Sequence, residues 1–79
     1  MVEPMEITMN ALRPGNGGRV TALTTVGPMR RRLLDLGFVP GAAVESLFRN
    51  AGGSLTAYAV RGAVIALRPA DARTVRVSI

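Results

Sequence analysis

Fifteen consecutive residues, Gly27–Gly41, contain the signals that begin, orient and end one short helix: GPMRRRLLDLGFVPG. Pro28 suits the first turn of a helix because its missing N–H is not needed there, and Gly27 can serve as the N-cap. Gly37 is placed for a left-handed C-cap, and Pro40 prevents the helix from continuing. The segment therefore predicts one helix with a sharp turn at each end.

The predicted helix has one apolar face and one leucine that lies off it. The residues of the apolar face recur at helical spacing and should pack on the rest of the protein; they are Met29, Leu33 and Leu36. Leu34 lies well off this stripe, with Arg30 on one side and Arg31 on the other. Two interpretations stay open: a barrel wide enough to cover Leu34, or a surface leucine rimmed by arginines, which is typical of docking patches.

The rest of the chain predicts short strands joined by glycine-rich turns. The clearest half-buried strand is at the C-terminus, where Val75, Val77 and Ile79 alternate with polar residues. Turns are predicted at Asn50–Gly53 and at Arg61-Gly62. The predicted strands are residues 5–9, 18–25, 44–49, 55–60, 63–67 and 74–79, with a helical turn at 69–73. This pattern predicts a mainly β chain, a small and partly open barrel of five to six strands with the helix between the second and third.

Length and composition favour one small soluble domain over residues 1–79. Apolar residues make up 48% of the chain, which is enough to build a folded core. No apolar run approaches the roughly 20 residues that a membrane-spanning helix needs. The N-terminal stretch Met1–Pro4 shows no features of a signal peptide. We therefore expect a cytoplasmic protein.

The formal charge is +5, and all ten basic residues are arginine. A basic surface favours acidic partners, nucleic acid among them. Most of the arginines are scattered, however, and the members of the run Arg30–Arg32 point in different directions around the helix. Aromatic residues are few for stacking on bases, and Phe48 is expected in the core. Nucleic-acid binding is therefore a secondary hypothesis. Arg31 and Asp35, four residues apart, are expected to form a weak surface ion pair.

The inventory of reactive groups argues against an enzyme. The chain has no histidine and no cysteine, so the usual nucleophile–base pairs and soft metal sites are missing. None of the carboxylates are spaced as a local pair; they are Glu3, Glu6, Asp35, Glu45 and Asp71. Gly15–Gly18 is glycine-rich, but no lysine follows it, so it does not match a phosphate-binding loop. We expect no catalytic residue, no cofactor and no metal site.

Residues 29–41 resemble the signature of the ferrous-iron transport protein A (FeoA) family. In that family an arginine-rich leucine helix ends in Leu-Gly and is followed after about two residues by Pro-Gly. Further segments resemble the family in the same order along the chain: 12–15 (LRPG), 18–20 (GRV), 60–68 (VRGAVIALR) and parts of 71–77. Residues 49–54 depart from it, because many members have a longer, proline-containing loop where this chain is short and glycine-rich.

The resemblance implies an SH3-like small β-barrel and an accessory role in ferrous-iron uptake. The implied partner is the FeoB-type membrane permease, which carries a cytosolic GTP-binding domain. The same domain type ends iron-dependent transcriptional repressors, but 79 residues leave no room for a DNA-binding half, so we expect a free-standing protein. The candidate contacts are Arg30, Arg31 and Leu34, with Arg61 as a weaker candidate. The alternatives are a basic nucleic-acid-binding barrel and an SH3-like domain that self-associates weakly through an edge strand.

Overall fold

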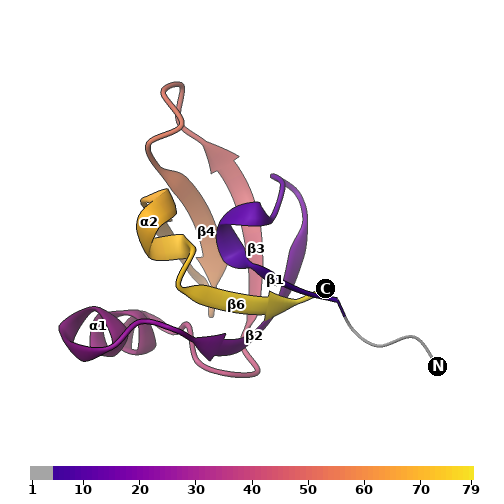
Figure 1. Ribbon diagram of the computed structural model, residues 1–79. Coiled ribbons are helices and arrows are strands. Elements are labelled where there is room, and N and C mark those ends of the chain that lie inside the picture. Colours follow the sequence, from indigo (N-terminus) through magenta and orange to yellow (C-terminus); the bar gives the residue numbers. More distant parts are fainter. Residues whose placement is uncertain (1–4) are drawn as a thin grey trace.

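The computed structural model describes residues 5–79 as one curved antiparallel sheet with short helices at its ends and side (Figure 1). The strands are β1 (Glu6–Thr8), β2 (Gly17–Leu23), β3 (Ala43–Arg49), β4 (Thr56–Val60), β5 (Ala63–Leu67) and β6 (Val75–Ser78). The helices are the 3-10 turn η1 (Met9–Ala11), α1 (Gly27–Leu36) and α2 (Pro69–Ala72). Met1–Pro4, where the sequence shows no signal-peptide features, lies outside the described residues.

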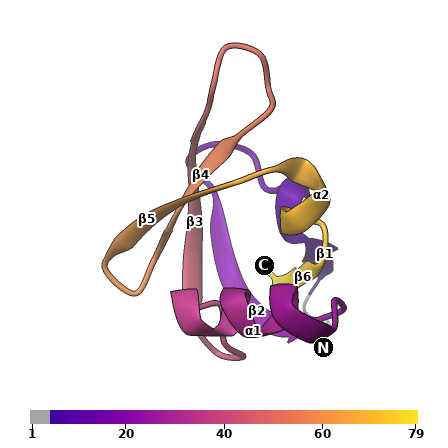
Figure 2. The same cartoon turned by 90° about the vertical axis from the view of Figure 1, so that its left-hand side faces the viewer.

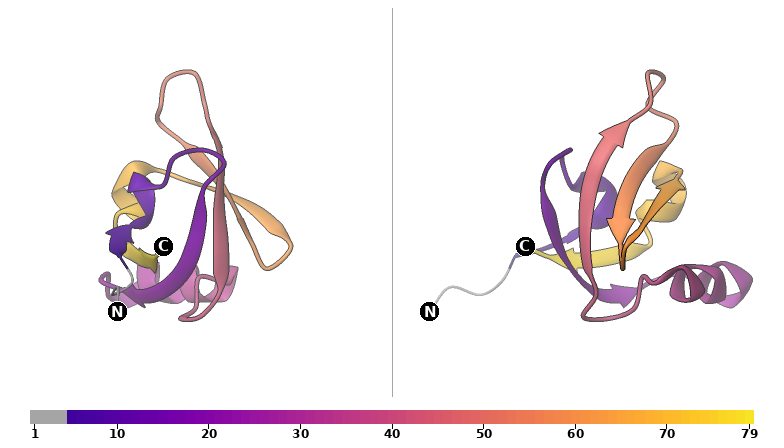
Figure 3. Two further views of the ribbon diagram at one scale, coloured as in Figure 1. Left: turned by 90° about the vertical axis from the view of Figure 1, so that its right-hand side faces the viewer. Right: turned by 180° about the vertical axis from the view of Figure 1, so that it is seen from behind.

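The strand order in the sheet is β1-β6-β2-β3-β4-β5. All neighbouring strands are antiparallel, and α1 connects the second strand to the third, as predicted. The edge strands β1 and β5 are not paired with each other, so the sheet curves without closing into a barrel (Figure 3). Helix α2 and the η1 turn lie between the two edges, because β5 runs into α2, and α2 contacts the η1 turn that follows β1.

The core fills the concave side of the sheet. Its largest fully buried side chains are Tyr58 and Phe38. Val75 and Val77 of β6 are also completely buried, as the pattern predicted, whereas Ile79, the third residue of that pattern, is 54% exposed. The side chain of Tyr58 is only 1% exposed.

The prediction that Phe48 belongs to the core is wrong, since its side chain is 60% exposed. A bulge in the pairing of β3 with β4 lies between Ser46 and Phe48. Val44 and Ser46 face the core on this strand. Strict alternation would turn Phe48 inward as well, but the bulge adds one residue and turns it to solvent.

Helix α1 packs on the core through the predicted face. Leu33 is completely buried, while Met29 and Leu36 are partly buried against the core. Gly37 ends the helix with a left-handed φ of 111°, and its N–H bonds back to the last turn. The N-cap is Val26, which has the extended backbone of a cap, and the helix begins at Gly27, so the predicted N-cap was wrong by one residue.

Candidate protein-docking surface

A shallow hollow of about 700 Å³ lies on the side of α1 that faces away from the core. All the residues that line it belong to this helix: Gly27, Pro28, Arg30, Arg31, Leu34 and Asp35. We call it the α1 hollow. It brings together Arg30, Arg31 and Leu34, three of the four residues that the sequence predicted as partner contacts. Their spacing along a helix explains this, since residues three and four apart are neighbours on its surface.

The exposure of Leu34 distinguishes the two interpretations that the sequence left open. Its side chain is half-buried, unlike that of Leu33, which is fully enclosed by the core. Leu34 is not among the side chains that pack against the buried core, and part of its surface lines the α1 hollow. An apolar side chain that is partly supported by the fold has a restricted position, which reduces the entropy lost on contact with a partner.

The arginines around Leu34 have no acidic partner in the described part of the chain. Ion pairs there join Arg68 to Asp71 and Arg76 to Glu6. The expected pair between Arg31 and Asp35 is not formed. Both side chains are exposed, and an exposed pair gains too little energy in water to hold two mobile side chains together. The α1 hollow therefore presents unpaired guanidinium groups beside one apolar contact.

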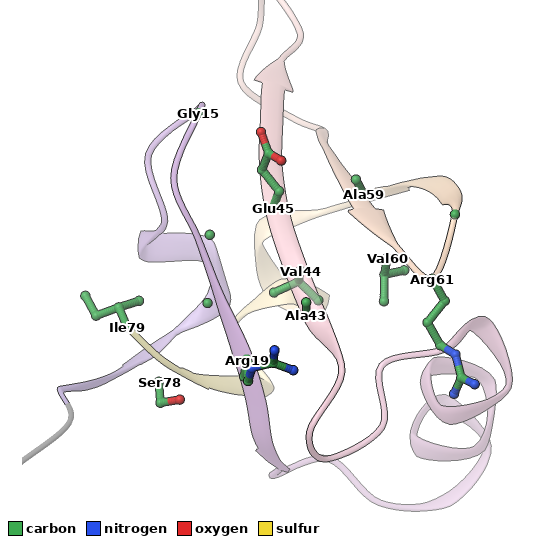
Figure 4. Close-up of a pocket in the computed structure, with 13 residues that line it drawn as sticks. Gly15, Arg19, Ala43, Val44, Glu45, Ala59, Val60, Arg61, Ser78 and Ile79 are labelled. Atoms are coloured by element: carbon green, nitrogen blue, oxygen red, sulfur yellow. The ribbon is translucent and has the colours of Figure 1, made fainter.

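Arg61, the fourth predicted contact, lies elsewhere. It occupies the turn between β4 and β5 with a φ of 49°, and Gly62 follows with a φ of 81°. Its side chain extends toward the end of α1 (Figure 4), where its carbon atoms cover Gly37. Arg61 does not line the α1 hollow, so the structure separates it from the other three candidates.

Arg61 instead lines a second groove, of about 750 Å³, on the outer side of the sheet (Figure 4). Arg19 and Glu45 also line this groove, and most of its other lining residues are small. A Cβ on Gly17 would lie 2.6 Å from the carbonyl oxygen of Val44, and one on Gly18 would collide with the carbonyl of Ser78. These glycines allow β2 to approach its neighbours closely. Close packing of the strands therefore explains why glycines line the floor of this groove. The sequence pattern does not predict this groove.

The arrangement offers recognition groups and little reactive chemistry. Among residues 5–79, no three acidic side chains lie close enough together to hold a metal ion. The one tyrosine, Tyr58, is buried, and this burial raises the pKa of its phenol. No helix in the described chain is both long and apolar enough to cross a membrane.

The family model of the FeoA domain matches residues 7–79. The solution structure of the FeoA protein from Chlorobium tepidum is 29% identical, with a TM-score of 0.86, and the match covers 92% of this chain and 70% of that one. The zinc complex of FeoA from Stenotrophomonas maltophilia, described as a procaryotic SH3 domain protein, is 27% identical, with a TM-score of 0.80 and coverage of 92% and 89%.

A more distant neighbour is a manganese-dependent transcriptional repressor, with 22% identity and a TM-score of 0.83. This match covers 99% of the present chain but 44% of the repressor, and it shows a shared fold. Among curated proteins, none matches this chain. The predicted mainly β, SH3-like fold and the resemblance to the FeoA family are thus confirmed.

Proposed function

Since this chain belongs to the FeoA family, we propose that it is a cytoplasmic accessory protein of ferrous-iron uptake that docks on the FeoB-type permease. Family membership supports a role in ferrous-iron transport, and the family is one of small accessory domains and not a known enzyme family. The proposed partner is the cytosolic GTP-binding domain of the permease. Docking there would regulate the transporter or help to assemble it.

The observation that carries this proposal is the α1 hollow. Leu34 supplies a half-buried apolar contact, and Arg30 and Arg31 flank it without acidic partners in the described chain. Unpaired arginines accelerate encounter with an acidic surface and penalise a basic one. The apolar residue then contributes through desolvation once the two surfaces meet.

A titration of the purified chain with the cytosolic domain of the permease tests the proposal. Leu34→Asp combined with Arg31→Glu places two negative charges in the α1 hollow, and we expect binding to weaken by at least about tenfold. The matched control is Phe48→Asp combined with Arg13→Glu, which makes the same change in charge at two exposed residues outside the hollow. We expect the control to bind as the unmodified chain does.

Equal binding by both double variants, with the fold intact by circular dichroism, would exclude the α1 hollow as the docking surface. The nucleic-acid alternative makes a different prediction. It requires association with generic RNA or DNA that weakens steeply as salt is added, and no binding at low salt removes it.

A further inference from the structure

Strand β5 is an edge of the sheet whose free side is open. It pairs with β4 alone, and it stands at the outer side of the sheet in Figure 2, with α1 below it. Val64 is 63% exposed and Ala66 is also exposed. An edge strand presents a row of backbone N–H and C=O groups that another extended chain can pair with.

The turn before β5 determines which residues carry these free groups. Arg61 and Gly62 both have positive φ, which is the signature of a two-residue type I′ hairpin turn. In such a hairpin the flanking pair, Val60 and Ala63, is hydrogen-bonded, and hydrogen-bonded pairs then alternate along the ladder. Val64 and Ala66 therefore direct their N–H and C=O groups away from β4. No turn, loop or side-chain hydrogen bond within residues 5–79 involves them.

The opposite edge of the sheet is protected in a way that β5 is not. Strand β1 has only three residues, and Glu6 on it forms an ion pair with Arg76 of the neighbouring strand. Short length and charge are two devices by which proteins prevent an edge from pairing. Strand β5 has five apolar residues, AVIAL, and neither a charge nor a proline interrupts them.

Positive charge surrounds this apolar edge. Arg61 precedes β5 and Arg68 follows it. The side chain of Arg68 is 73% exposed even though its Nε lies 3.6 Å from Asp71. A hollow of about 180 Å³ beside the C-terminal end of the strand is lined by Arg32 as well as by apolar side chains, Leu33 among them.

We propose that β5 is a docking edge for an extended segment of another protein, one with an apolar centre and acidic residues at its ends. The segment adds as an antiparallel strand and exchanges both N–H···O bonds with Val64 and with Ala66. Its acidic ends meet Arg61 and Arg68. This site is separate from the α1 hollow and does not depend on the function proposed above.

A second copy of the chain is a poorer occupant because of charge. Antiparallel pairing of two β5 strands about Ile65 would place Arg68 of one copy beside Arg61 of the other at both ends. Like charges that meet across a strand pair are destabilising. Each copy also carries a formal charge of +5, so the two copies repel at longer range.

A synthetic peptide with the centre Val-Thr-Val-Thr-Val and two glutamates at each end tests the proposal on the full chain. Amide shifts and hydrogen exchange read out the site. We expect the peptide to protect the amides of Val64 and Ala66, while the same centre with two lysines at each end binds about tenfold more weakly. N-methylation throughout the centre should abolish binding, because it removes the backbone donors.

Two variants of the chain sharpen the result. Ala66→Pro removes an N–H that the ladder with β4 does not use, and should abolish peptide binding. Arg61→Glu with Arg68→Glu should reverse the preference toward the lysine-ended peptide, while Arg13→Glu with Arg73→Glu, which changes the net charge equally, should not. Leu34→Asp in the α1 hollow should leave peptide binding unchanged.

The proposal is overturned if the glutamate-ended peptide fails to bind at millimolar concentration, or if the lysine-ended or N-methylated peptide binds equally well. Protection of Val64 and Ala66 that rises with protein concentration in the absence of peptide would show that a second copy is the occupant, and would also overturn it. The binding experiments with the three peptides need only the unmodified chain, so they decide the question even if Ala66→Pro fails to fold.

Discussion

The side chain of Arg61 lies across Gly37, so that a Cβ placed on the glycine would be 3.0 Å from Cδ of the arginine. This contact joins the turn between β4 and β5 to the C-terminal end of α1. It fixes the helix end against a hairpin that lies far away in the sequence. It also explains why Arg61 turns away from the α1 hollow.

We expect Gly37→Ala to destabilise the protein by about 1–3 kcal/mol, because φ at this position is 111° and the added carbon would press on Arg61. Gly52→Ala is the matched control, since its φ is not in the positive range and no atom lies near the added carbon. The control should change stability by no more than about 0.5 kcal/mol. Denaturant unfolding of both variants measures the difference, and equal effects would contradict the role assigned to Gly37.

Adjacent leucines in α1 should respond differently to truncation. Leu33 is completely buried, so Leu33→Ala should reduce the free energy of unfolding by about 2–5 kcal/mol. Leu34 is half-buried, and Leu34→Ala should cost about 1 kcal/mol or less. Denaturant unfolding reads both values. A loss at Leu34 as large as that at Leu33 would mean that this side chain serves the core and not a partner.

The hydroxyl of Ser46 is buried and has no hydrogen-bond partner in the structure. Removing an unpaired buried polar group relieves its desolvation penalty, so Ser46→Ala should be neutral or stabilise by up to about 1 kcal/mol. Ser54→Ala is a contrasting control, because Ser54 accepts a hydrogen bond of 2.9 Å from the side chain of Asn50 and should lose a little stability. Thermal unfolding compares the two, and a clear loss at Ser46 would show that its hydroxyl is satisfied in solution.

The pKa of Tyr58 is raised above the ordinary value for tyrosine, chiefly because burial disfavours the phenolate, although the side chain of Thr56 and the charge of Arg49 oppose the shift. Below about pH 10 the phenol is neutral in both states and the full stability is present. Above that pH the unfolded chain releases the proton first, so stability falls as the pH rises toward the folded pKa.

Tyr58 is the only tyrosine in the chain, so its ultraviolet absorbance reports this titration directly. Tyr58→Phe should remove the tyrosine contribution and flatten the decline of stability above about pH 10. A Tyr58 absorbance that titrates as in a free peptide, together with equal pH slopes for the two proteins, would refute the prediction.

Much of the fold was predictable because it depends on neighbouring residues. The predicted strand 63–67 coincides with β5, and the left-handed cap at Gly37 is confirmed. The first strand was predicted one residue too long at each end, since β1 begins at Glu6 and η1 begins at Met9. Periodicity alone cannot show such an end, because the alternation of apolar and polar residues continues into the turn.

The candidate site was predictable only where one helix determines it. Arg30, Arg31 and Leu34 lie together because helical geometry requires it. The position of Arg61, the bulge that exposes Phe48 and the open edge at β5 depend on the pairing of distant segments. The groove on the outer side of the sheet was missed for the same reason.

The sequence by itself determined where α1 begins and ends to within one residue, which of its faces packs on the core, and the turn at Arg61-Gly62. Proline and glycine restrict or extend the local backbone, and that effect acts over a few residues whatever the rest of the chain does. The tertiary structure decided what stays exposed: the outward position of Phe48, the separation of Arg61 from the α1 hollow, and the unpaired edge of β5. Exposure depends on segments distant in sequence that pack together, and the local sequence pattern does not show which segments those are.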